Sequence, residues 1–316
     1  AWFSPRHRYV LPTDSRMMLL PGGLGDNNIM GTRIYSMHPH TSPDTTAHLP
    51  EHTLKAHALN VVYDMRSAEM LAITAGERIN TLRVAGELAV GAKYLARTDS
   101  KTVGILGSGR LALGSLRALK ETVAINSAKV FSTNAERRNQ FAAQALDMTG
   151  VPVKPVTTPN EALEEVDIVI TAASSMEPAF DGRRLEPGTH VCCVGGEIQA
   201  GGWELDDEAM KRISVLAVIN KAHTMGGGMG EDTPNRTFSR AVDQAIITWN
   251  DVVELSDIMV GRAVGRREKQ EITLFDNRAT GACDVALAFR AYQVAEKVGL
   301  GTLLDWGKGL EPDWRQ

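Results

Sequence analysis

The chain has 316 residues, of which 34 are basic and 38 acidic, and its formal net charge is −4. This length allows two domains with substantial cores, and the nearly balanced charge excludes a basic field that would recruit nucleic acid or an anionic membrane surface. The sequence contains no apolar run long enough to cross a membrane and no secretory signal, so we expect a cytoplasmic protein, and the start at Ala1 leaves room for earlier residues.

The first hundred residues differ in pattern from the rest of the chain. Turn-rich stretches at residues 20–28 and 38–44 separate short alternating strands, and a long helical pattern follows from about Ile79 to Leu95. This order of strands followed by a helix predicts a separate α+β domain.

Strand and helix patterns alternate from residue 100 onward. Helical stretches such as Ala135–Met148 and Asn160–Glu165 separate short apolar runs, which predicts a mostly parallel, doubly wound α/β sheet whose ligand lies at the carboxyl ends of the strands. The strand candidates are Val103–Leu106, Lys129–Ser132, Val151–Val156, Ile168–Ala172, His190–Val194 and Val215–Ile219.

The last part of the chain adds a strand and a helix. Glu271–Phe275 is a further strand candidate, and Cys283–Val298 is a strongly apolar helix that ends at Gly299 and Gly301. Periodicity alone does not decide to which domain this helix belongs.

Neither the cysteines nor the histidines predict a metal site. Cys192 and Cys193 are adjacent in an apolar strand pattern and Cys283 stands alone, so buried apolar thiols are expected. Six of the eight histidines fall in the first 57 residues, but a proline interrupts the His48–His52 pair and no acidic or cysteine cluster completes a ligand set.

The most informative stretch is Lys101–Leu119, where an apolar strand breaks into a glycine turn and continues as an amphipathic helix. Gly107 permits a tight turn, Gly109 lets the backbone approach a pyrophosphate, and the helix N-terminus offers free N–H groups to phosphate. The alternative is an ordinary glycine-rich turn. The predicted cofactor-binding residues here are Gly107, Ser108, Gly109, Arg110 and Leu111.

The residues after the second strand of this unit favour NADP(H) over NAD(H). An NAD-binding unit usually carries an acidic residue at this strand end to bind the ribose 2′-hydroxyl, and this chain has none there. Ser132, Thr133 and Asn134 can hydrogen-bond a phosphate, and Arg137 or Arg138 could pair with its charge. If both arginines lie on a solvated helix face instead, NAD(H) remains possible.

Motifs spread over nearly the whole chain resemble the ornithine cyclodeaminase/mu-crystallin family. The motifs that carry the resemblance are Ser4–Arg6, Gly31–Arg33 through His38-Pro39, Leu49–His52, Thr81–Ala85, Gly107–Gly109, Val194–Glu197, Gly230-Glu231, and Glu271–Asp276 before Asp284. The resemblance implies a substrate-binding and dimerisation domain formed by residues 1–98 plus 277–316, with a Rossmann domain at 99–276 inserted, and a homodimer.

The resemblance also implies hydride transfer between a nicotinamide and the α-carbon of a small amino or imino acid, as in an imine reductase or an amino-acid dehydrogenase. Two alternatives stay open. One is a lyase of the ornithine cyclodeaminase type, which releases ammonia with tightly bound NAD. The other is a protein that binds the cofactor without catalysis.

Site residues follow from the same resemblance, position by position. Arg6, Arg33 and Arg83 would hold the substrate carboxylate, and a guanidinium suits this role because it pairs with a carboxylate in a bidentate way. Glu197 would face the amino or imino nitrogen and, with Arg33, take part in catalysis. Thr81 and Gly195 join the cofactor-binding residues.

Several residues depart from the family pattern around the substrate site. Arg33 stands where the family usually has lysine, and Glu197 replaces an aspartate. Leu111 replaces a glutamine in the Rossmann turn, and residues 277–279 replace the usual Ser-x-Gly. Arg278 in this last segment would suit a dicarboxylate substrate.

Overall fold

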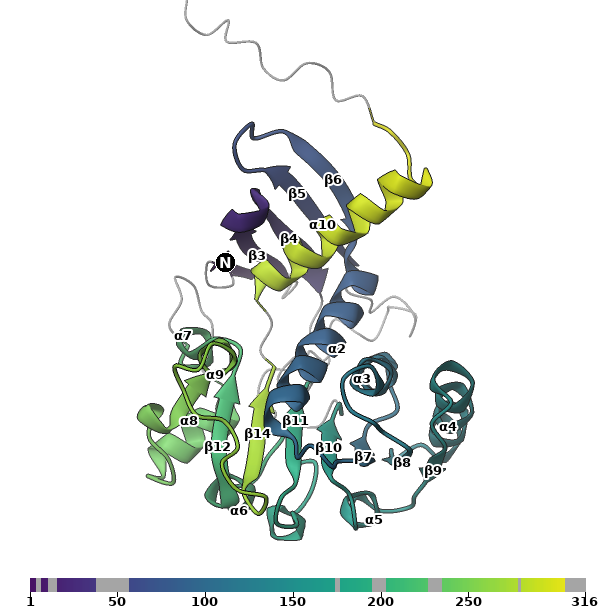
Figure 1. Ribbon diagram of the computed structural model, residues 1–316, viewed down its shortest axis with the longest axis vertical. Coiled ribbons are helices and arrows are strands. Elements are labelled where there is room, and N and C mark those ends of the chain that lie inside the picture. Colours follow the sequence, from purple (N-terminus) through teal and green to yellow (C-terminus); the bar gives the residue numbers. More distant parts are fainter. Residues whose placement is uncertain are drawn as a thin grey trace, which may run out of the picture.

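The computed structural model describes residues 1–3, 7–10, 16–37, 57–173, 177–194, 203–226, 235–277 and 280–304. These residues form two sheets, and a long helix, α2 (Gly76–Leu95), runs from one sheet to the other (Figure 1). The larger sheet and the helices around it lie at one end of the molecule, and the smaller sheet lies at the other (Figure 1).

The larger sheet has the order β13-β12-β14-β11-β10-β7-β8-β9, and its neighbouring strands are parallel. Its strands are β7 (Thr102–Leu106), β8 (Ser127–Phe131), β9 (Val153–Pro155), β10 (Ile168–Thr171), β11 (His190–Cys193), β12 (Ile213–Val218), β13 (Val252–Glu254) and β14 (Ile272–Asp276). The predicted α/β class with a Rossmann-type parallel sheet is therefore confirmed.

Helices cover both faces of this sheet, which explains why its strands are continuous apolar runs. On one face, α2, α3 (Arg110–Lys120) and α4 (Ala135–Thr149) lie over side chains such as Ile105 and Ile170. The other face carries α5 (Pro159–Leu163), α6 (Asp207–Arg212) and α8 (Arg236–Asp243). Shorter helical elements are α7 (Lys221–Thr224), α9 (Leu255–Met259), η1 (Gly25–Asn27), η2 (Gly182–Arg184) and η4 (Trp249–Asp251).

The smaller sheet is antiparallel and has the order β1-β3-β4-β5-β6, with β2 paired to β3. Its strands are β1 (Trp2–Phe3), β2 (His7–Val10), β3 (Arg16–Leu24), β4 (Ile29–Met37), β5 (His57–Asp64) and β6 (Met70–Ala75). Helix α10 (Gly281–Val298) lies across one face of it (Figure 1). A Cβ on Gly22 would stand 2.2 Å from the Ala282 backbone nitrogen, so the sheet and helix touch at a glycine.

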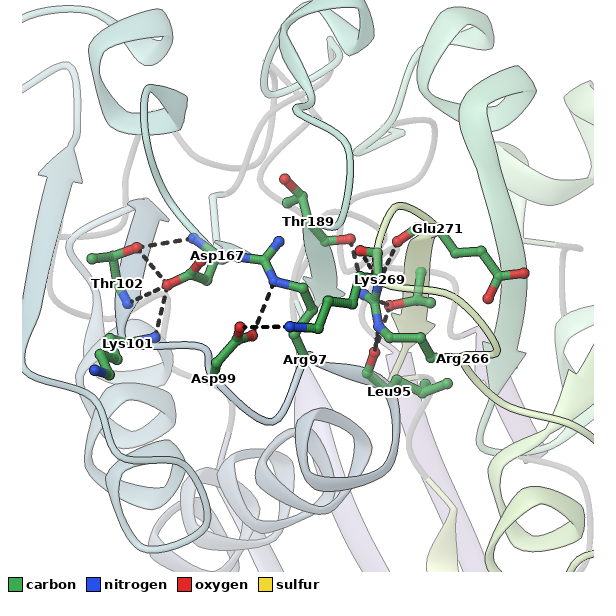
Figure 2. A network of polar contacts seen from close by, with 11 residues as sticks. Leu95, Arg97, Asp99, Lys101, Thr102, Asp167, Thr189, Arg266, Lys269 and Glu271 are labelled. Carbon is green, nitrogen blue, oxygen red and sulfur yellow. Dashed lines mark hydrogen bonds and ion pairs between the residues drawn. The ribbon is translucent and has the colours of Figure 1, made fainter.

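A polar network ties the C-terminal end of α2 to the amino ends of the parallel strands (Figure 2). The Thr273 hydroxyl donates to the Leu95 carbonyl at 2.9 Å, accepts from Arg266 Nη2 at 3.0 Å and lies 2.9 Å from His190 Nδ1. Arg266 Nε donates to the same Leu95 carbonyl at 2.8 Å. We call these four residues, with Thr189, the amino-edge network.

A neighbouring group extends this network toward β7. Asp167 accepts hydrogen bonds from the backbone nitrogens of Lys101 and Thr102, at 2.7 and 2.9 Å, and from the Arg97 guanidinium (Figure 2). Because Arg97 and Lys101 lie two and six residues after the end of α2, these contacts fix the position of this end of the helix on the sheet.

Candidate active site

The glycine turn after β7 has the geometry that a phosphate group needs. Gly107 has φ +115°, and a Cβ there would lie 2.4 Å from the Ala172 carbonyl oxygen, so only glycine fits. A Cβ on Gly109 would meet no atom within 4 Å, and Gly109 caps α3 without a side-chain hydrogen bond. The first turn of α3 therefore keeps space and N–H groups for an anion, which fits the pyrophosphate of a dinucleotide.

Two predicted cofactor-binding residues hold α2 against this turn. Arg110 Nη1 donates to the Thr81 hydroxyl and to the Glu77 carbonyl, both at 3.1 Å. Ser108 is half-buried in the turn, whereas the side chain of Leu111 packs against the apolar core. The Rossmann turn and the first half of α2 are thus neighbours.

Among the residues after β8, some side chains make contacts within the protein and others are exposed to solvent. Asn134 accepts a hydrogen bond from the Arg137 backbone nitrogen at 2.9 Å and so caps α4. Arg138 lies over the Phe131 ring at 5.9 Å and donates to the Ser132 carbonyl. The side chain of Arg137 is exposed, whereas Arg138 is half-buried. Of the two predicted phosphate-pairing arginines, Arg137 is therefore the one that keeps a solvent-facing position.

Two predicted carboxylate-binding arginines meet at one oxygen. Arg33, on β4, donates from Nη1 to Asn80 Oδ1 at 2.8 Å, and Arg83, on α2, donates from Nη2 to the same oxygen at 2.6 Å. Both arginines are nearly buried, with 8% and 6% of their surface exposed. The Arg33 guanidinium also stacks over the Tyr35 ring at 4.6 Å.

Two buried carboxylates hold Arg83 from behind. Its Nε lies 3.1 Å from Asp284 Oδ1 on α10, and its Nη1 lies 3.2 Å from Glu87 Oε2. Burial alone would lower the pKa of Arg83, but the ion pairs with Asp284 and Glu87 outweigh it and raise the pKa above its ordinary value. We call Arg33, Asn80, Arg83, Glu87 and Asp284 the arginine cluster.

Burial lowers the pKa of a basic group but raises that of an acid, as in Glu87 of this cluster. Desolvation raises the pKa of Glu87, and the Arg83 charge opposes only part of that shift. Burial, and then the Glu87 carboxylate, raise the pKa of the nearby Cys283 thiol well above its ordinary range. Cys283 is therefore a neutral thiol and not a nucleophile.

Further polar side chains gather at the carboxyl ends of the parallel strands. The Thr171 hydroxyl donates to Glu204 Oε2 at 2.7 Å, and Asn235 Nδ2 donates to Asp276 Oδ1 at 3.2 Å. Desolvation, followed by these two carboxylates, raises the pKa of Cys193 well above its ordinary value. This is the edge where the sheet is expected to bind its ligand.

The sequence reasoning missed several residues of the site. Asn80 and Glu87 lie one helical turn before and after Arg83, which is the only sequence signal that could have found them. Asn277 donates from Nδ2 to the Val84 carbonyl at 3.0 Å, and its buried Oδ1 accepts no hydrogen bond from the described part of the chain. The predicted residues Arg6, Gly195, Glu197 and Arg278 lie outside the described residues.

Within the described ranges, no group of three or more His, Cys, Asp or Glu side chains is placed to hold a metal ion. None of the helices in those ranges combines the length and apolar character that a membrane crossing requires.

Comparisons with known proteins agree with this geometry. The sequence model of the ornithine cyclodeaminase/mu-crystallin family matches residues 4–298. Delta(1)-pyrroline-2-carboxylate reductase of Bacillus cereus is 27% identical over 244 residues, which cover 77% of this chain and 72% of that protein. Alanine dehydrogenase of Archaeoglobus fulgidus is 26% identical over 246 residues, which cover 78% and 72%.

A solved structure is similar over nearly the whole chain. Thermococcus litoralis Delta(1)-pyrroline-2-carboxylate reductase, in complex with NADH and L-proline, has a TM-score of 0.84 and 28% sequence identity to this protein. The superposition covers 96% of this chain and 89% of that one.

Proposed function

The chain belongs to the ornithine cyclodeaminase/mu-crystallin family, and from this premise we propose that it is an NAD(P)-dependent oxidoreductase that reduces a small imino acid at its α-carbon. The similarity to pyrroline-2-carboxylate reductases makes a cyclic imino acid such as Δ1-pyrroline-2-carboxylate the first substrate to test. The reverse reaction is the dehydrogenation of the corresponding amino acid.

One observation carries this proposal. Helix α2 bears Thr81, which contacts Arg110 of the glycine turn, and Arg83, which meets Arg33 at a shared oxygen. The glycine turn therefore contacts the same helix that carries Arg83, and Arg83 shares its acceptor with Arg33 of the neighbouring strand β4. This arrangement supports a substrate carboxylate anchored beside a nicotinamide.

The residues of this chain would act by binding and by holding a proton. Arg33 and Arg83 bind the substrate carboxylate and fix the α-carbon, and their burial strengthens this interaction because little water screens it. We assign Arg6 to the same carboxylate and Glu197 to the imino nitrogen, which gains a proton as the C=N bond is reduced. When bound, the reduced nicotinamide supplies the hydride that the α-carbon receives.

For the cofactor, we propose a preference for NADP(H). The exposed Arg137 side chain and the hydroxyl groups of Ser132 and Thr133 follow β8, where an NAD-binding unit usually has an acidic residue. The Asn134 side chain caps α4 and so orients this segment. Gly107, Gly109 and Gly195 would let the backbone approach the rest of the cofactor. Ser108 lies in the turn, and Leu111 would contribute through its backbone in the first turn of α3, since its side chain packs against the core.

We also propose that residues 1–98 plus 277–316 form a substrate-binding and dimerisation domain around the Rossmann domain at 99–276. The contact of α10 with the antiparallel sheet supports this division. Met17, Leu59 and Ile73 of that sheet are exposed, with 41%, 38% and 46% of their surface accessible. Exposed apolar side chains on a sheet support a homodimer, which sedimentation velocity would test.

An activity assay tests the proposed function. The purified protein is incubated with NADPH or NADH and with Δ1-pyrroline-2-carboxylate, or with pyruvate and ammonia, and cofactor oxidation is followed by absorbance. We expect turnover of the cyclic imine, with a lower KM for NADPH than for NADH. Ammonia release from ornithine without net cofactor turnover would instead identify a cyclodeaminase, and cofactor binding without any turnover would identify a non-catalytic binder.

A further inference from the structure

Asn80 lies between the two arginines proposed to bind the substrate carboxylate. Its Oδ1 accepts hydrogen bonds from Arg33 at 2.8 Å and from Arg83 at 2.6 Å. Arg33 comes from β4 and Arg83 from α2, so two separate elements meet at this single side-chain oxygen. The position of Asn80 therefore sets where the two guanidinium groups lie relative to one another.

A neutral acceptor at this point has a specific electrostatic effect. Two guanidinium cations repel each other at short range, and an acceptor oxygen between them offsets that repulsion. An amide oxygen does so without cancelling their charge, whereas a carboxylate in the same place would form ion pairs with both. Because Asp284 and Glu87 already face Arg83, a neutral amide avoids adding a third negative charge where an anionic substrate has to bind.

The amide nitrogen of Asn80, Nδ2, is a hydrogen-bond donor. Because Oδ1 accepts from the two arginines, the amide group has a defined orientation, and Nδ2 is its free end. Nδ2 makes no hydrogen bond with the part of the chain that the structure describes, and Asn80 is only half-buried. An N–H group beside two guanidinium groups complements a carboxylate, which has two oxygens and accepts only.

We propose that Asn80 is a positioning and specificity residue for the anionic substrate: Oδ1 holds Arg33 and Arg83 at a common point, and Nδ2 donates to the substrate carboxylate. The inference rests on the proposed function, because it takes this pair of arginines as the carboxylate site.

The test compares Asn80→Asp with Asn80→Ala in the reduction of Δ1-pyrroline-2-carboxylate by NADPH. Aspartate keeps the size and the acceptor of asparagine, but it replaces the donor by a charge that competes with the substrate carboxylate. We expect KM to rise about 10-fold in Asn80→Ala, from lost hydrogen bonds to charged groups. We expect a larger rise in Asn80→Asp, of about 100-fold or more, from repulsion of the substrate anion.

Three further measurements make the test specific. The Kd for NADPH should stay at the wild-type value in Asn80→Asp, and its Tm should stay at or above that of the wild type, because the contacts with the arginines are retained. Asn126→Asp, at an exposed site before β8, makes the same chemical change far from the arginine cluster and should leave KM unchanged. A wild-type KM in Asn80→Asp would overturn the inference, since a purely structural acceptor is preserved in that variant.

The outcomes also separate this inference from the function on which it rests. If the wild-type protein reduces neither Δ1-pyrroline-2-carboxylate nor the imine formed from pyruvate and ammonia, and does not bind L-proline in calorimetric titrations, the proposed function fails and the role of Asn80 falls with it. If the wild-type protein is active and Asn80→Asp is equally active, only the role of Asn80 is wrong.

Discussion

Helix α2 connects two polar clusters that differ in how completely their hydrogen bonds are satisfied. In the amino-edge network, the Arg266 guanidinium donates to five acceptors, and the Thr273 hydroxyl bonds to three different residues, although His190 Nε2 has no partner among the described residues. In the arginine cluster, two carboxylate oxygens, Glu87 Oε1 and Asp284 Oδ2, are buried and accept no hydrogen bond from that part of the chain. Within the described residues, the C-terminal end of α2 thus lies in a network whose hydrogen bonds are nearly all satisfied, and its N-terminal half lies in a cluster with more unsatisfied acceptors.

This difference in hydrogen bonding indicates that the amino-edge network serves stability, whereas the arginine cluster serves binding. Satisfied buried groups stabilise the fold, whereas each unsatisfied buried acceptor costs about 1–3 kcal/mol. In the described part of the chain, the arginine cluster has two such unsatisfied acceptors, Glu87 Oε1 and Asp284 Oδ2, and this cost to stability falls where two guanidinium groups and an amide could bind an anion. The amino-edge network holds the far end of α2, so that Arg83 on this helix has a defined position relative to the parallel sheet.

Loss of Arg83 should have the largest effect on stability, because it removes the cation that pairs with two buried carboxylates of the arginine cluster. Arg83→Ala leaves Asp284 and Glu87 buried without their cation, and we expect the free energy of unfolding to fall by about 3–5 kcal/mol. Urea denaturation measures this change. The control Arg78→Ala removes an exposed arginine of the same helix and should leave stability nearly unchanged. Wild-type stability in Arg83→Ala would contradict the ion-pair interpretation.

Loss of Arg33 should affect binding more than stability. Its guanidinium stacks on Tyr35 and donates to the neutral Asn80 amide, so its removal does not strip Asp284 and Glu87 of their cation, as loss of Arg83 does. We expect Arg33→Ala to weaken transition-state binding by about 2–5 kcal/mol, measured as kcat/KM, while the Kd for NADPH is retained. An equal loss of cofactor and substrate affinity would indicate a damaged fold instead of a lost carboxylate anchor.

His190 should make the amino-edge network sensitive to acid. Burial, and then the Arg266 charge, lower its pKa from 6.5 to about 3, so the folded protein holds it neutral. Its contribution to stability is complete above pH 6.5 and is lost as the pH falls from 6.5 toward 3, because the unfolded chain takes up a proton there and the folded chain does not.

The corresponding measurement is the free energy of unfolding against pH. We expect the wild-type protein to lose on the order of 2–4 kcal/mol more than His190→Asn between about pH 7 and pH 4. Asparagine retains a polar group near the position of Nδ1 but does not titrate. Parallel curves for the wild type and His190→Asn would show that this histidine is not the sensor.

Much of the fold could be predicted from the sequence because its signals are local. Short apolar runs locate β7 and β10, and Gly107 marks the turn by a conformation that other residues avoid. Boundaries are less accurate: the helical pattern predicts α2 from Ile79, and the helix begins at Gly76, where the lack of a side chain lets it start against β5.

The site could be predicted only where a motif exists. Resemblance to the family points to Arg33 and Arg83, but the sequence does not reveal that Arg33 meets Asn80, because that contact requires β4 and α2 to lie side by side. The Arg83–Asp284 ion pair joins residues 201 positions apart, beyond the reach of any local pattern. The separate positions of Arg137 and Arg138 likewise depend on the helix cap at Asn134.

The smallest expected effect concerns the hydroxyl at the centre of the amino-edge network. Thr273→Val keeps the shape of the buried side chain but removes the oxygen that contacts Leu95, Arg266 and His190. Arg266 retains four other acceptors, so we expect a loss of about 1–3 kcal/mol in unfolding free energy and little change in kcat/KM at saturating cofactor. Thr122→Val removes the hydroxyl of an exposed residue, which hydrogen-bonds only to the Ala89 and Leu119 carbonyls, and should cost less. If Thr273→Val instead lowered activity without lowering stability, the amino-edge network would be part of the active site, and the separation of stability from binding along α2 would be wrong.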